Sequence, residues 1–97
     1  MQRLFVERRL REVHARLVRA REELAIMDEQ LAVVSDSTEE ARIRSLVSET
    51  PLATHDYGEQ QRHADAMARA RSAMVANIAE LERRREELLQ SVGGRNG

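Results

Sequence analysis

The sequence predicts an all-α fold, an antiparallel helical hairpin (coiled coil) of two long helices over about 2–34 and 55–91, with a short helix over about 38–48 at the tip. The chain is rich in Ala, Leu, Glu and Arg, which are strong helix formers. Aromatic residues, which favour strands, make up only 2% of it. Its apolar residues also recur at alternating spacings of four and three, the pattern of a coiled-coil seam.

The first long helix is predicted by an uninterrupted heptad seam. The seam residues are Val6, Leu10, Val13, Leu17, Ala20, Leu24, Met27, Leu31 and Val34. The polar run Ser35-Asp36-Ser37 is expected to end this helix, and Ser37 to Glu40 matches a capping box that would start the next one. We expect the short helix to present Ile43, Leu46 and Val47 on one face and to end before Pro51.

The second long helix carries a matching seam. Its residues are Ala64, Met67, Arg71, Met74, Ile78, Leu81, Arg85, Leu88 and Val92. Antiparallel pairing aligns all seam positions, with Leu31 beside Ala64 and the Arg71 guanidinium reaching out to Glu23. A bundle with the two long helices parallel is the alternative. We expect one domain over 1–92 and, after the glycine pair, a disordered tail over 93–97.

A second apolar stripe lies beside the first seam, and a two-helix hairpin does not need it. Leu4, Val18, Ala25, Ile26, Ala32 and Val33 form this outer stripe. So wide an apolar face suits a bundle of three or four helices. The short helix could fold back over part of the stripe; otherwise a protein partner or a second copy of the chain covers it, and we expect a homodimer.

The composition argues against several other functions. Without cysteine the chain has no disulfide or thiolate chemistry, and no nucleophile–base arrangement or phosphate-binding glycine loop occurs, so we expect no enzyme activity, small-molecule substrate or cofactor. The net charge of −1 argues against a nucleic-acid partner, and the basic runs 8–9 and 83–85 are interleaved with glutamates. The chain shows neither a membrane span nor a signal-peptide core, so we expect a cytoplasmic protein with no membrane partner.

One cluster resembles a metal site. His55, Glu59 and His63 follow one another at intervals of four residues, which places them on one helix face. The span of about 12 Å is too long for one ion to reach both histidines. We therefore expect a solvated polar face here and no metal site. The alternative is a zinc site in which two of the three residues bind the ion together with a ligand from the tip or from a second chain.

The predicted tip is acidic, with Asp36, Glu39 and Glu40 at its start. In this respect the hairpin resembles the transcription factors that insert a coiled coil with acidic tip residues into the secondary channel of RNA polymerase. That resemblance implies, as an alternative function, a transcription-associated regulator that contacts RNA polymerase or a sigma factor. The globular second domain of those factors has no counterpart in this chain.

The stretch 42–53, together with 62–67, is similar to small coiled-coil proteins of high-GC actinobacteria. This resemblance implies a helical fold and no particular activity. The sequence therefore predicts a non-enzymatic coiled-coil interaction or adaptor protein. Its expected contact residues are Leu4, Val18, Ile26, Val33, Asp36, Glu39 and Glu40.

Overall fold

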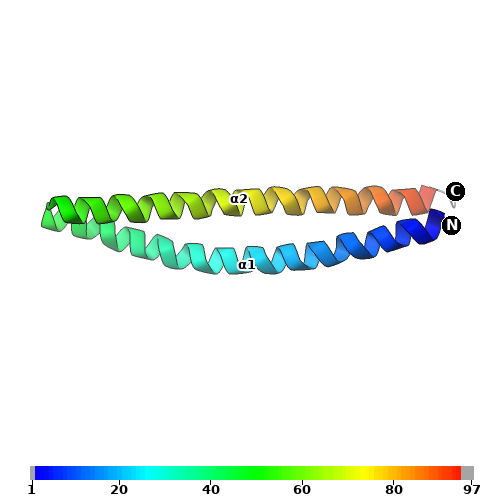
Figure 1. Cartoon of the computed structure of the whole chain (residues 1–97), viewed down its shortest axis with the longest axis horizontal. Helices are drawn as coiled ribbons and strands as arrows, with labels where there is room; N and C mark the ends of the chain where they lie inside the picture. The colour runs from blue at the N-terminus through cyan, green and yellow to red at the C-terminus, as the bar shows by residue number, and fades with distance from the viewer. Residues whose placement is uncertain (1, 95–97) are drawn as a thin grey trace. The chain divides into compact units, whose positions relative to one another are not determined.

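The computed structural model describes residues 2–94 and contains two long α-helices. Helix α1 is Gln2–Ser48 and helix α2 is Pro51–Gly94, joined by the two residues Glu49 and Thr50 (Figure 1). No strand occurs over residues 2–94. The all-α fold with two long helices is thus confirmed. The tail expected over 93–97 lies outside the described residues from position 95 on, whereas Gly93 and Gly94 belong to α2.

The separate short helix expected over 38–48 is wrong, because these residues continue α1 without a break. Thr38 shows how the polar run is accommodated: its hydroxyl donates to the carbonyl oxygen of Val34, 2.8 Å away, within the same helix. A side chain that bonds back onto its own helix does not interrupt it. The first helix therefore ends at Ser48, not near position 34.

The link has the features of a tight helix–helix turn. Glu49 has a φ of 50°, the left-handed conformation that commonly ends a helix, and its N–H donates to the Ser45 carbonyl oxygen at 3.2 Å. Thr50 then caps α2, since its hydroxyl oxygen accepts from the Ala53 N–H at 3.2 Å. Pro51 occupies the first helical position, where its missing N–H costs nothing. Helix α2 accordingly begins about four residues before the start expected near position 55.

The chain divides into two compact units. Unit 1 combines residues 2–24 of α1 with 74–94 of α2. Its core holds Val13, Leu17, Ala20, Ile78 and Leu81, with Leu24, Met74 and Leu88 packed against them. All eight were expected in the seams, and Leu17 is fully buried. Figure 1 shows the N- and C-terminal ends at the same end of this unit.

Unit 2, residues 25–73, contains the link and packs smaller side chains. Its buried residues are Thr38, Ala41 and Ala64. Ala41 and Thr38 extend the four–three spacing of the first seam past Val34 in unchanged phase. The sequence signal for a continuous helix was therefore present, but alanine and threonine replaced the large apolar residues.

In each unit the two helix segments run antiparallel. In unit 2, Thr38 lies against Gln60, with 3.4 Å between its hydroxyl and the Gln60 carbonyl oxygen, while the earlier residue Asp28 pairs with the later residue Arg71. The parallel arrangement is therefore wrong. The expected register is also shifted, because Arg71 reaches Asp28 and not Glu23. A two-residue link closes the hairpin further along the chain than the long tip that we expected.

Candidate interaction surfaces

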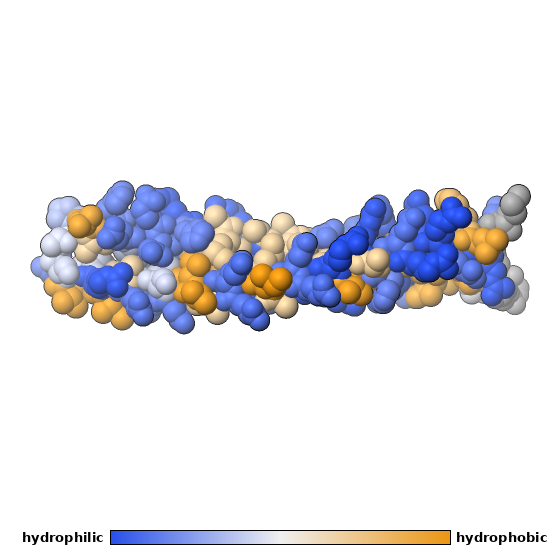
Figure 2. Space-filling model, turned by 60° about the horizontal axis from the view of Figure 1, so that its bottom comes forward, coloured by the Kyte–Doolittle hydropathy of each residue, from blue (hydrophilic) through white to orange (hydrophobic). Residues whose placement is uncertain are grey.

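The four large residues of the outer stripe all lie on α1, and all are exposed. The exposed fractions are 68% for Leu4, 40% for Val18, 53% for Ile26 and 66% for Val33. The expected covering helix does not exist as a separate element, so the residues that were to fold over the stripe instead extend α1. Figure 2 shows hydrophobic residues interspersed with hydrophilic ones on the face over α1.

The expected acidic residues are exposed, but they do not lie at the turn. Asp36, Glu39 and Glu40 are inside α1, and Glu40 lies eight positions before the helix end at Ser48. Eight residues of α-helix span about 12 Å. The acidic tip is therefore an acidic segment on the flank of a helix.

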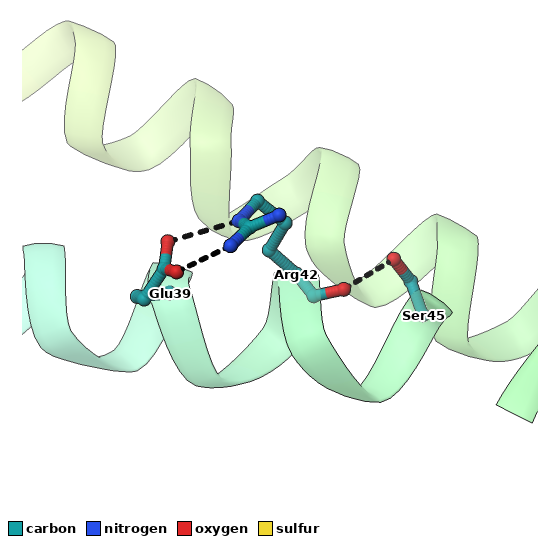
Figure 3. A network of polar contacts seen from close by, with 3 residues as sticks. All are labelled: Glu39, Arg42 and Ser45. Carbon is teal, nitrogen blue, oxygen red and sulfur yellow. Dashed lines mark hydrogen bonds and ion pairs between the residues drawn. The ribbon is translucent and has the colours of Figure 1, made fainter. Parts of the chain in front are cut away.

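One of these acids is already engaged in an ion pair. Both carboxylate oxygens of Glu39 accept from the Arg42 guanidinium, at 3.0 and 2.6 Å (Figure 3). Hydrogen bonds from Arg42 lower the pKa of Glu39, and the same contacts raise the pKa of Arg42. The Ser45 hydroxyl donates to the Arg42 carbonyl oxygen at 2.8 Å. Glu39 thus offers a fixed, partly neutralised carboxylate.

The residues around the turn form an apolar surface that the sequence analysis assigned differently. Ile43, Leu46, Val47 and Leu52 are exposed, Val47 to 80%. We expected the first three to share the packing face of a short helix. Because α1 continues in the phase set by Thr38 and Ala41, they fall outside the seam. Following that phase past Val34 would have identified them as exposed.

Unit 1 contains a shallow groove that brings the two basic runs together. Arg9 and Arg16 line it from α1, and Arg84 lines it from α2, with Glu12 and Glu87 beside them. The Arg9 guanidinium also lies 5.6 Å from the Phe5 ring centre. The glutamates expected to interleave with these arginines are in the groove, so the surface is of mixed charge.

Unit 2 has a more apolar groove, lined by Val33, Val34, Met67 and His63, with Glu29 and Gln30 at its edge. His63, the last residue of the predicted polar cluster, lines this groove. In that cluster His55 Nε2 lies 3.8 Å from Glu59 Oε1, which also accepts from Arg62 at 2.6 Å. That arginine lowers the pKa of Glu59. Across residues 2–94 no three potential metal ligands gather.

Neither α1 nor α2, over the part of the chain described, has a stretch apolar enough to cross a membrane. Comparison of the chain with models of known protein families, with curated proteins and with solved structures finds no match. The function must therefore be argued from the surfaces described above.

Proposed function

We propose that this chain is a non-enzymatic coiled-coil interaction protein that self-associates through the outer stripe of α1 into a helical bundle. The stripe consists of Leu4, Val18, Ala25, Ile26, Ala32 and Val33. Its partner in the bundle is a second copy of the chain, which makes the assembly a homodimer.

The observation that carries this proposal is the imbalance between exposed and buried apolar side chains. Over residues 2–94, the large hydrophobic residues in the buried core are Val13, Leu17, Ile78 and Leu81. Eleven large hydrophobic residues are exposed: Leu4, Phe5, Val18, Ile26, Val33, Ile43, Leu46, Val47, Leu52, Val75 and Leu89. Fully burying one such side chain contributes about 1.5–3 kcal/mol. A large amount of apolar surface therefore stays exposed in the single chain and is available for association.

The expected test is the solution mass over a concentration series, measured by light scattering. A homodimer has twice the chain mass of 11.1 kDa. Glutamine at Leu4, Val18, Ile26 and Val33 should shift the mass toward the monomer. The matched control places glutamine at Leu52 and Leu89, which are similarly exposed but lie on α2, and should leave the dimer intact. A wild-type chain that is monomeric at every concentration would refute self-association.

The resemblance to transcription factors does not support a second proposal. It depended on acidic residues at the tip, and Asp36, Glu39 and Glu40 lie within α1. The turn instead presents Val47 and Leu52, which are apolar and exposed. No feature of this end of unit 2 favours a polymerase channel over any other protein surface.

A further inference from the structure

We propose that the second copy packs along α1 in the antiparallel direction, with the two-fold axis beside Ala25. This inference rests on the proposed self-association and adds the residues that meet and their register. Two sequence rows of α1 support it: a mainly apolar row on the exposed side, and a mainly charged row between that row and the seam.

The apolar row repeats every seven residues along the uninterrupted helix α1. Its members from Arg11 to Glu39 each follow a seam residue directly, and every member is exposed. The members are Leu4, Arg11, Val18, Ala25, Ala32, Glu39 and Leu46. Positions seven apart lie on one face of a helix that packs in a coiled coil.

This row is complementary to itself when it is reversed about Ala25. Leu4 of one copy then meets Leu46 of the other, and Val18 meets Ala32. Two leucines thus face each other at each end of the row. Nearer the centre a valine faces an alanine, a large residue against a small one, as close packing favours. The alanine on the axis lets the two helices approach closely. In a two-fold dimer each of these contacts occurs twice.

The charges on the same row also match. Reversal about Ala25 places Arg11 of one copy opposite Glu39 of the other. In the single chain Glu39 is held in place by Arg42, so its carboxylate is already oriented when the second copy arrives. Arginine and carboxylate across an interface fix the register of the partners.

A neighbouring row adds two further opposite-charge pairs in the same register. This row also repeats every seven residues, and it contains Glu7, Arg21, Asp28 and Arg42. This row is centred half a residue before Ala25, an offset of less than about 1.5 Å along the helix. With that offset, Glu7 of one copy lies opposite Arg42 of the other, and Arg21 lies opposite Asp28. Glu7 and Arg11 of one copy therefore meet Arg42 and Glu39 of the other in an alternating cluster. In the single chain Glu7 pairs with Arg3 and Glu39 with Arg42, both within α1. Arg21 pairs with Glu82 of α2, and Asp28 pairs with Arg71 of α2, so a second copy shares or exchanges these ion pairs.

Other arrangements of the same two rows place like charges together. Parallel packing sets Arg11 against Arg11 and Asp28 against Asp28. An antiparallel shift of one heptad in either direction opposes either Arg21 with Arg21 or Asp28 with Asp28. A third alternative uses the row that contains Ile26, with the two-fold axis beside Ile26. This arrangement would place Glu12 of one copy opposite Glu40 of the other. Like charges across an interface oppose association, so the register about Ala25 is favoured.

Charge exchange tests the register directly. Arg11→Glu and Glu39→Arg should each weaken dimerisation about tenfold, because each disrupts two symmetric pairs. The double variant should recover most of the loss. Glu39→Arg also removes the intrahelical pair with Arg42, but the double variant lacks that pair too, so recovery would report the contact between copies. Arg44→Glu, at an exposed position of α1 outside the outer stripe and outside both rows, is the matched control.

A cysteine test uses the absence of native cysteine. Ala25→Cys should form a disulfide-linked dimer, since the two residues meet on the axis. Ala15→Cys should not, because ten residues from the axis the two copies of this position are separated by about 30 Å. A dimer that neither cross-links through position 25 nor recovers in the double charge variant would overturn this register and leave the proposed self-association standing. A wild-type monomer would overturn both.

Discussion

Replacing Leu17 by alanine tests the core assignment most directly. Within residues 2–94, Leu17 is the one large side chain that is fully buried, in a cluster with Val13, Ala20, Ile78 and Leu81. Removing a buried leucine side chain costs about 2–5 kcal/mol, through lost apolar burial and the cavity that remains. Folded domains are stable by only about 5–15 kcal/mol in all. Leu17→Ala should therefore remove a large fraction of the stability of the fold.

The assay is urea denaturation followed by circular dichroism at 222 nm, at one fixed protein concentration. Leu89→Ala is the matched control, because Leu89 also lies in unit 1 but is 48% exposed. It should shift the free energy of unfolding by no more than about 0.5 kcal/mol. Equal losses in the two variants would show that burial does not distinguish these leucines, and the core assignment would fail.

Three further predictions concern the turn and one ion pair. Glu49→Gly should raise the free energy of unfolding by about 1 kcal/mol in urea denaturation, because glycine adopts the φ of 50° without strain; a loss of stability would contradict the turn geometry. Thr50→Ala should lower it by about 1 kcal/mol, since the Ala53 N–H loses its capping oxygen, while Thr50→Ser should retain it. The lowered pKa of Glu39 means that its pair with Arg42 stabilises the folded chain above the ordinary pKa of 4.5 and is lost as the pH falls through the lower folded value. The difference in melting temperature between the wild type and Glu39→Gln should therefore be present at about pH 7 and vanish at about pH 2; a constant difference would exclude this pair as its cause.

The seams could be predicted because large apolar residues mark them. Every seam residue expected from Val6 to Val34 is buried or half-buried in the structure. The prediction of the first helix failed beyond Val34. The next two seam positions are occupied by Thr38 and Ala41, and threonine and alanine give only a weak hydrophobic signal. Local turn signals in Ser35-Asp36-Ser37 then outweighed the unbroken spacing. In the fold the spacing prevailed, because bonding of Thr38 to Val34 keeps the polar run helical.

The register and the acidic segment could not be predicted because both depend on the length of the link. Two seams with the same spacing align equally well after a shift of one step. Only the position of the turn decides between the alignments, and Glu49 and Thr50 place it later than expected. The same shift moved Glu39 from the tip to the flank of α1 and gave Arg71 the partner Asp28. The exposure of the outer stripe depended less on the register, because it follows from the heptad position alone.

The small side chains beside the turn have a consequence for how the chain folds. The buried residues of unit 2 are Thr38, Ala41 and Ala64. Bringing them together costs little chain entropy, because the short link already holds the two helix segments close. Their small side chains, however, bury little apolar surface. The strongly attractive pairings, such as that within the cluster of Leu17 and Leu81, join residues near opposite ends of the sequence. The chain must therefore close a long loop before it gains most of its stabilisation. We expect its contact order to be high for a helical protein, and its folding to be correspondingly slow.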